Sequence, residues 1–366
     1  MPIVYGTSHS LEQQPMKLTR RTGIFAATSA ILALSLSACG STAEPKAATS
    51  DAPAASSDFT PVTIKNIYGE TTIDKAPERV ATISWVNADT LLALDTVPVG
   101  MDTDNYGQNA NNSTDWKDAA LEKLGASIGT EKAPHQYAVG DDPDYDAIAR
   151  SKPDVIFAPY SGLKKEQYEK LKKIAPVVGP IEANYTTSWQ EATTAAGQML
   201  GKQDEAKTLI SDIEAKMAKV GEEHPVLKDT SFIAADLSSP DTAYVYSTGD
   251  TRPRFLSSIG MKQAPYVDKN AAKDAFFFTV SPEKVNEWDA DVVFASAPQG
   301  QSIKDVIKTQ PLYGQIPAVK TDAVALPGTD QATLAISAAS PLSIEWALEN
   351  VVPKIVTAAD NAAAKK

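Results

Sequence analysis

The residues that could carry out covalent chemistry or hold a metal are few and scattered. Cys39 is the single cysteine, so one molecule cannot form an internal disulfide. Beyond it the histidines are His135 and His224, in different halves of the chain, where they are not expected to converge on a metal ion. Ser161 and Lys164 have the Ser-x-x-Lys spacing of a serine nucleophile, but its Ser-Asp-Asn and Lys-Thr-Gly companions are missing from the sequence. We therefore expect a protein that binds a ligand without converting it, with a serine enzyme as the alternative.

Arginines are the second group with chemical potential. After Cys39 the chain holds four of them, and Arg79 and Arg150 have structural interpretations in a predicted strand and a predicted helix. Arg252 and Arg254 fall in a predicted loop between a strand and a helix. A planar guanidinium makes several charge-assisted hydrogen bonds to an anionic group. At least one of this pair is expected to bind the ligand; the alternative is a solvated pair, or one bridged to Asp250.

The N-terminal segment predicts export. Basic residues precede a nearly uncharged and mostly apolar run over residues 23–38, which is too short to span a bilayer and fits the apolar part of a signal peptide. We expect a signal peptide over residues 1–38, starting at Met1 or Met16. A twin-arginine signal at Arg20 is a weaker alternative.

Cys39 follows small residues that resemble the lipobox of bacterial lipoproteins, in which the thiol takes a diacylglyceryl group. The predicted tether over residues 39–59 is rich in Ala, Ser, Thr and Pro and cannot bury a core. A lipidated residue anchors strongly, because each buried methylene contributes about 0.8 kcal/mol. We expect a protein on the cell membrane that faces the periplasm or the cell exterior.

The net charge of the chain limits the kinds of partner that it is expected to bind. The chain has 46 acidic and 34 basic residues, a formal net charge of −12. An acidic protein of this kind is not expected to bind nucleic acid or to adhere electrostatically to a membrane.

Strand and helix patterns alternate along the chain, which predicts an α/β protein. The predicted strands are 79–84, 97–101, 154–158, 231–236, 243–247 and 291–295, and the predicted helices include 88–94, 146–151, 164–174, 202–220, 254–259 and 283–287. The helix over 202–220 carries one apolar stripe and is expected to end at Gly221 and to bridge two lobes. The expected limits are 60–187 for an N-terminal lobe, 188–222 for a linking helix and 223–366 for a C-terminal lobe.

An internal repeat supports the two lobes. Asp146 opens a short predicted helix, and Asp154 opens a buried strand eight residues later; Glu283 and Asp291 repeat the pattern in the second half. We therefore expect two pseudo-symmetric lobes, each a mainly parallel sheet flanked by helices, joined by one long rigid helix. Ligands of such sheets bind at the carboxyl ends of the strands.

These patterns also resemble a known family. Segments 77–83, 89–94, 97–100, 152–156, 161–171, 174–178, 281–283, 290–293 and 311–313 are similar to the siderophore- and cobalamin-type substrate-binding proteins of ABC importers. The resemblance covers residues 60–355 and is closest to the iron–siderophore group. It implies a class III periplasmic binding protein that acts as a monomer, closes slightly on a ferric siderophore and delivers it to a permease with its ATPase.

The resemblance implies ligand contacts at strand ends. Catecholate and carboxylate siderophores are anionic, which suits Arg252 or Arg254; aromatic side chains suit flat ligand rings, with core filling as the alternative. The further candidates are Trp85, Asn105, Tyr106, Tyr160, Ser161, Tyr185, Trp189 and Gln299.

The family also docks one glutamate of each lobe onto arginines of the permease. The repeat puts Asp146 and Glu283 at those positions, although Asp146 is one methylene shorter than the usual glutamate; favourable placement in a first helical turn is the alternative role. No resident cofactor is expected. The alternatives for the whole protein are a haem or cobalamin carrier of the same family, or a serine enzyme or sensor domain.

Overall fold

The computed structural model describes residues 59–183, 185–272 and 275–366, all within one compact unit. The predicted signal peptide, Cys39 and all of the predicted tether except Phe59 lie outside the described residues. In the described part of the chain no helix is long and apolar enough to cross a membrane.

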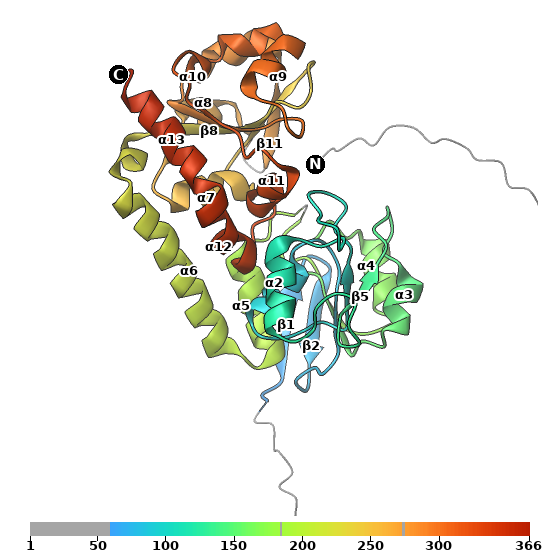
Figure 1. Cartoon of the computed structure of the whole chain (residues 1–366). Helices are drawn as coiled ribbons and strands as arrows, with labels where there is room; N and C mark the ends of the chain where they lie inside the picture. The colour runs from blue at the N-terminus through green and yellow to red at the C-terminus, as the bar shows by residue number, and fades with distance from the viewer. Residues whose placement is uncertain (1–58, 184, 273–274) are drawn as a thin grey trace, which may run out of the picture. The chain divides into compact units, whose positions relative to one another are not determined.

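The N-terminal lobe is built on a parallel sheet with the strand order β5-β4-β3-β6-β7 (Figure 1). Its strands are β3 Val80–Thr82, β4 Gly100–Asp102, β5 His135–Tyr137, β6 Val155–Phe157 and β7 Val177–Val178, and its helices are α1 Asn87–Ala93, α2 Asp115–Lys123, α3 Tyr145–Arg150 and α4 Lys165–Leu171. Strands β3 and β6 are buried along their whole length, as in a parallel sheet covered on both faces.

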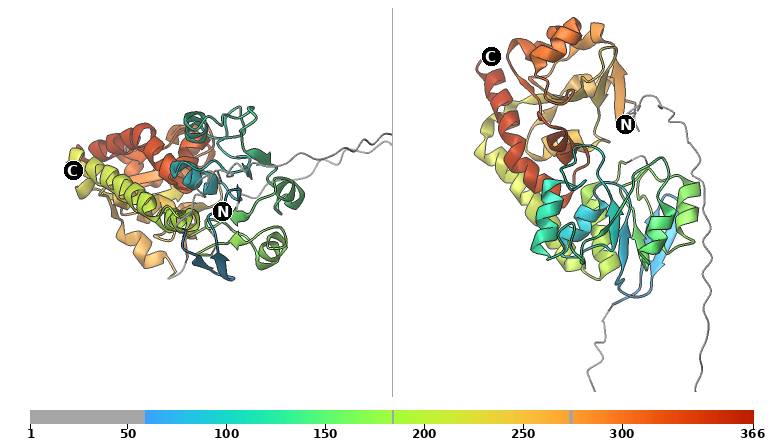
Figure 2. Two further views of the ribbon diagram at one scale, coloured as in Figure 1. Left: turned by 90° about the horizontal axis from the view of Figure 1, so that it is seen from below. Right: turned by 45° about the vertical axis from the view of Figure 1, so that its right-hand side comes forward.

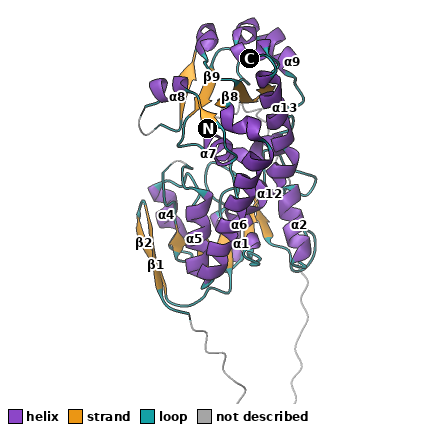
Figure 3. Ribbon diagram, turned by 90° about the vertical axis from the view of Figure 1, so that its left-hand side faces the viewer, coloured by secondary structure: helices purple, strands orange, loops and turns teal. Residues whose placement is uncertain are grey.

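An antiparallel hairpin that the sequence pattern did not predict lies beside this sheet. It consists of β1 Val62–Asn66 and β2 Gly69–Ile73 (Figure 3). Only Ile64, Thr71 and Ile73 of the two strands are buried, and Thr71 donates to the carbonyl of Val177 on β7 at 2.5 Å.

The C-terminal lobe contains a mixed sheet with the order β11-β9-β8-β12-β13. Its strands are β8 Ser231–Asp236, β9 Ala243–Tyr246, β10 Lys262–Gln263, β11 Phe277–Val280, β12 Val292–Ser296 and β13 Val324–Ala325. Its helices are α7 Thr251–Ser258, α8 Pro265–Asn270, α9 Ile303–Thr309, α10 Pro317–Lys320, α11 Asp330–Ser337, α12 Pro341–Asn350 and α13 Val352–Ala363, with the 3-10 helices η1 Pro225–Asp229, η2 Pro282–Glu287 and η3 Pro311–Gln315. Strands β8, β10, β12 and β13 are parallel, whereas β9 and β11 are antiparallel to their neighbours.

The internal repeat corresponds to matching contacts in the two lobes. The carboxylate of Asp154, just before β6, accepts the backbone N–H groups of Glu78 and Arg79 at 2.8 and 3.1 Å. Asp291, just before β12, accepts the backbone N–H and the hydroxyl of Ser231, both at 2.8 Å. Each aspartate thus holds the start of the central strand, β3 or β8, beside its own strand. Asp154 and Asp291, which occupy equivalent places in the repeat, therefore have the same structural role in their lobes.

The segment between the lobes differs from the expected single helix. Residues 188–222 contain two helices, α5 Trp189–Leu200 and α6 Gln203–Glu223, which pack against each other. Gly201 ends α5 in the left-handed conformation, with φ +70°. The long helix α6 runs past both lobes (Figure 1) and continues through Gly221 to Glu223, so the predicted stop at Gly221 is wrong.

The chain crosses between the lobes a second time. Helix α12, near the C-terminus, packs against α1 and α2 of the first lobe and lies beside α6, while α13 returns to β12 and β13 (Figure 2). Trp346 of α12 meets Trp116 of α2 with ring centroids 5.4 Å apart. The first lobe is therefore completed by residues from the far end of the sequence, inside the predicted C-terminal lobe.

Candidate functional site

Three of the predicted aromatic residues come together between the lobes. Trp85 follows β3, Tyr160 follows β6, and Tyr185 lies in the loop before α5. The rings of Trp85 and Tyr185 stack with centroids 5.8 Å apart and an interplanar angle of 15°, and Tyr160 meets Tyr185 at 5.7 Å. The hydroxyl of Tyr160 donates to the carbonyl of Ser337 at the end of α11, at 3.4 Å, so this cluster touches the second lobe.

Tyr185 is held in an unusual position. Its side chain is 38 % exposed and its backbone is left-handed, with φ +63°, which is costly for a residue other than glycine. A Cβ atom on Gly162 would lie 2.5 Å from the Tyr185 ring, so only glycine lets the ring lie against the backbone there. Tyr185 therefore presents an exposed aromatic ring from a backbone conformation that few residues other than glycine adopt.

Arg252 lies in the first turn of α7 and not in a loop, so that part of the prediction is wrong. The helix starts earlier than predicted because Asp250 caps it, accepting the backbone N–H of Arg252 at 2.9 Å. The same carboxylate accepts from Nη1 of Arg252 at 2.7 Å, and the guanidinium lies 3.9 Å from the centre of the Tyr246 ring. Nε of Arg252 is buried and has no hydrogen-bond partner among the described residues. Burial disfavours the charge, but Asp250 and the other neighbours hold the pKa of Arg252 above its ordinary value.

Tyr106 belongs to the same neighbourhood. Burial raises the pKa of its hydroxyl to about 12; the carboxylates of Asp330 and Asp236 add to the shift, and Thr333 and Arg252 oppose it. Asp236 ends β8 and Asp330 starts α11, so Tyr106 of the first lobe lies within electrostatic range of two acidic residues of the second.

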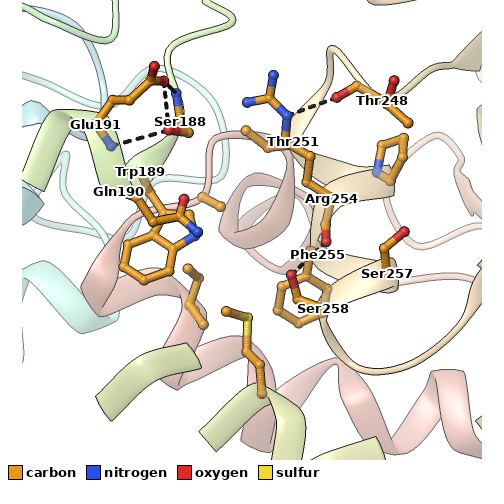
Figure 4. Close-up of a pocket in the computed structure, with 14 residues that line it drawn as sticks. Ser188, Trp189, Gln190, Glu191, Thr248, Thr251, Arg254, Phe255, Ser257 and Ser258 are labelled. Atoms are coloured by element: carbon orange, nitrogen blue, oxygen red, sulfur yellow. Dashed lines mark hydrogen bonds between the residues drawn. The ribbon is translucent and has the colours of Figure 1, made fainter. Parts of the chain in front are cut away.

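Arg254 and Trp189 lie in a different place. The Nε of Arg254 donates to the Thr248 carbonyl at 2.8 Å and its Nη1 to the Thr186 carbonyl at 3.0 Å, which ties α7 to the loop before α5. Both residues line a pocket of about 710 Å³ between α5, α6, α7 and α12 (Figure 4). Arg254 thus stabilises the loop that carries Tyr185, through the carbonyl of the next residue, Thr186.

No hydrogen bond in the described part joins the side chains of the remaining candidates to these groups. Asn105 and Gln299 are exposed, and Gln299 lines a small recess next to Thr333. Ser161 is buried, and its hydroxyl donates to the carbonyl of Ala158 at 2.8 Å, which is a structural role in the turn after β6.

A buried group of charges lies directly behind the aromatic cluster. Lys117 of α2 donates to Asp104 at 2.6 Å and to the carbonyl of Trp85 at 3.3 Å, and lies 3.7 Å from Asp89. Asp104 and Asp89 outweigh the effect of burial and hold the pKa of Lys117 above its ordinary value. Burial raises the pKa of Asp89 to about 6. This group fixes the backbone from which Trp85 projects.

Asp102, at the end of β4, also adjoins the cluster. Burial raises the pKa of its carboxyl to about 7, while the N–H of Ser84 donates to it at 2.6 Å. Asp102, Asp236 and Tyr246 were missed by the sequence reasoning. Asp250 was noted only as a possible salt-bridge partner, yet its position two residues before an arginine at a helix start is an N-cap signal.

The serine motifs do not form a reactive site. The Ser161 hydroxyl is engaged by the backbone, and Lys164 is an exposed residue at the start of α4. Residues 125–129 have the Gly-x-Ser-x-Gly spacing of a hydrolase, which the sequence reasoning overlooked. That spacing requires a strand-to-helix turn, whereas Ser127 follows α2 in an irregular segment. Among the described residues there is no group of three or more His, Cys, Asp or Glu side chains that could hold a metal.

The two predicted docking residues are both exposed. Asp146 lies in the first turn of α3, which is capped by Asp144 through a 2.9 Å bond to the N–H of Ala147. Glu283 lies in the first turn of η2, where Ser281 makes no side-chain cap.

Two α/β lobes with aromatic rings and a guanidinium between them define a solute-binding protein of the two-lobed class. A family model described as "Periplasmic binding protein" matches residues 80–328, more than half of the chain. The chain therefore belongs to the periplasmic binding protein family, and the predicted family and two-lobed α/β fold are confirmed.

Individual proteins that are similar to this chain are also solute-binding proteins. The crystal structure of PiaA from Streptococcus pneumoniae TIGR4 in complex with ferrichrome is 31 % identical, with a TM-score of 0.72, and the match covers 82 % of this chain and 99 % of PiaA. The Fe(3+)-citrate-binding protein YfmC of Bacillus subtilis (strain 168) is 28 % identical, over 70 % of this chain and 75 % of YfmC. YhfQ of the same bacterium, provisionally named as a substrate-binding lipoprotein of an ABC transporter, is 25 % identical over 71 % of this chain and 78 % of its own length.

Proposed function

We propose that this protein is the extracytoplasmic solute-binding component of an ABC importer and that it captures a ferric siderophore between its lobes. The observation that carries this proposal is the combination of Trp85, Tyr160 and Tyr185 with Arg252 on facing lobes. PiaA, which shares the fold, binds the ferric siderophore ferrichrome, and YfmC is named for ferric citrate.

Each group has a distinct part in the proposed capture. Tyr185 and Trp85 offer stacked faces to the apolar or planar parts of the chelate. Polar contacts come from opposite lobes: from Nε of Arg252, which has no partner among the described residues, and from the hydroxyl of Tyr106. The iron stays bound by its siderophore throughout, so the protein needs no metal ligands of its own.

Delivery is proposed to use the exposed carboxylates of Asp146 and Glu283. The repeat puts them at corresponding places on the two lobes, where each can meet a cationic group of a permease subunit. Retention at the membrane is proposed to use the lipid on Cys39, and replacement of Cys39 by Ser is expected to release the protein from the membrane fraction.

The ligand experiment is a titration of the purified protein with a panel of ferric siderophores, followed by quenching of tryptophan fluorescence. The same titration is made with Trp85→Phe and Trp189→Phe. We expect saturable quenching that is greatly reduced in Trp85→Phe and largely retained in Trp189→Phe. If no ferric chelate binds while haem or cobalamin does, the proposed ligand is wrong; if none of these binds, the transport function itself is wrong.

A further inference from the structure

The arginine between the lobes already has a counter-ion. The carboxylate of Asp250 contacts Arg252 with both oxygens, one on the backbone N–H at 2.9 Å and one on Nη1 at 2.7 Å. The two side chains are 14 % and 9 % exposed, and the face of Tyr246 covers the guanidinium. An ion pair so shielded from water presents almost no net positive charge to a ligand.

The other charges around the site add to its negative side. Asp236 and Asp330 both lie within electrostatic range of Tyr106. Arg254 is the second guanidinium nearby, but two of its donors are used by backbone carbonyls. Among the described residues named here, carboxylates therefore outnumber guanidinium groups.

The guanidinium of Arg252 nevertheless keeps donors that no described residue uses, because Nη1 is its only nitrogen with a hydrogen-bond partner in the described part of the chain. Nε of Arg252 is buried without a partner in the described part of the chain, and a buried unpaired donor is unfavourable until an acceptor arrives. The site therefore favours a ligand that offers an oxygen acceptor and carries no excess negative charge.

Siderophore classes differ in this respect. Three hydroxamate groups balance the charge of Fe(III), so their complex is neutral and its hydroxamate oxygens accept hydrogen bonds. Ferric complexes of catecholates and citrate keep a negative charge. We propose that this site selects ferric trihydroxamates over ferric catecholates and ferric citrate, and that Asp250 is a residue that sets the choice. This inference rests on the proposed function and differs from the sequence-based expectation of an anionic chelate.

The test measures dissociation constants for four probes: a neutral ferric trihydroxamate (ferrichrome), a cationic one (ferrioxamine B), ferric dicitrate and a ferric tricatecholate. The unaltered protein is expected to bind the two hydroxamates at least 100-fold more tightly than the anionic pair. Tighter binding of either anionic complex overturns the selectivity and leaves the proposed function standing. A failure of all four probes overturns the proposed function.

The variant Asp250→Asn removes the charge and keeps an oxygen that can cap α7. It is expected to improve the binding of the anionic probes relative to ferrichrome by about 10-fold or more. Asp236→Asn, which does not contact Arg252, is a second variant that serves if Asp250→Asn folds poorly. It is expected to shift the ratio in the same direction. Asp360→Asn, on the exposed side of α13, is the matched control and should leave the ratio unchanged. Unchanged ratios in both Asp250→Asn and Asp236→Asn would refute the electrostatic basis of the selection.

Discussion

At the scale of single residues, Arg252 shows how side-chain geometry qualifies an interpretation of the sequence. Its sequence context predicted a guanidinium at the edge of the cleft, available to an anionic ligand. The pairing with Asp250 was the alternative that the sequence left open, whereas the stacking on Tyr246 depends on side-chain geometry that no residue pattern encodes. The arginine that the sequence suggests as an anion-binding group is paired with Asp250, and its Nε has no partner among the described residues.

A second residue-scale feature gives a prediction about affinity. In Gly162→Ala the new methyl group would lie 2.5 Å from the ring of Tyr185, so the exposed ring must move away from Trp85. We expect the affinity for the siderophore to fall about 10-fold. The free energy of unfolding should change by less than about 1 kcal/mol, because a surface ring and not the core is displaced. Gly140→Ala, where the added atom meets only an ordinary contact at 3.5 Å, is the control for titration and melting. Equal affinity in both variants would exclude a role for the position of Tyr185.

Asp102 gives a prediction about pH. Burial raises its pKa in the folded protein to about 7, against about 3.9 in an unfolded chain. The folded state therefore binds the proton more tightly, and its contribution to stability is complete below about pH 4 and lost as the pH rises through about 7. Asp102→Asn cannot titrate, so its melting temperature should fall less between about pH 5 and pH 8 than that of the unaltered protein, by a few degrees. Parallel melting curves for the two proteins would contradict a raised pKa at this position.

At the scale of elements, the strands were the most predictable part. Strands β3, β6 and β12 are short apolar runs that are buried completely, and burial is the property that apolar runs signal. The β1–β2 hairpin was missed because few of its residues face a core. The early start of α7 and the division of 188–222 at Gly201 depend on capping residues, which shift an element boundary without altering the apolar pattern.

Three helices meet at one buried ion cluster, and this meeting can be tested. Asp89 of α1 accepts from Trp116 of α2 and from Ser340, the N-cap of α12, both at 2.7 Å, and Lys117 of α2 supplies the cation. Lys117→Met would leave the carboxylates of Asp89 and Asp104 buried without it, at an expected cost of about 3–5 kcal/mol in the free energy of unfolding.

The matched control for that cluster is on the same helix. Lys123→Met removes an ion pair with Asp95 whose side chains are 77 % and 65 % exposed, and should change stability by no more than about 0.5 kcal/mol. Denaturant unfolding of the two variants gives the comparison. Similar losses in the free energy of unfolding for Lys117→Met and Lys123→Met would show that the buried ion cluster does not stabilise the first lobe.

At the scale of the whole molecule, the pseudo-symmetry makes the docking proposal testable in intact cells. Asp146→Arg and Glu283→Arg place a cation where a permease arginine is expected, so uptake of the bound ferric siderophore should fall at least 10-fold while binding by the purified protein stays the same. Glu287→Arg, which is exposed on the same short helix as Glu283, is the control. Normal uptake with Glu283→Arg would remove that residue from the docking surface.

The closure of α12 over the first lobe also bears on how the chain matures. Synthesis from the N-terminus produces Asp89 and Lys117 long before Ser340 and Trp346, which contact the same part of the first lobe. The first lobe can therefore complete its packing only after most of the polypeptide has been made. Its final stability depends on a helix that lies more than 200 residues further along the sequence than α1 and α2.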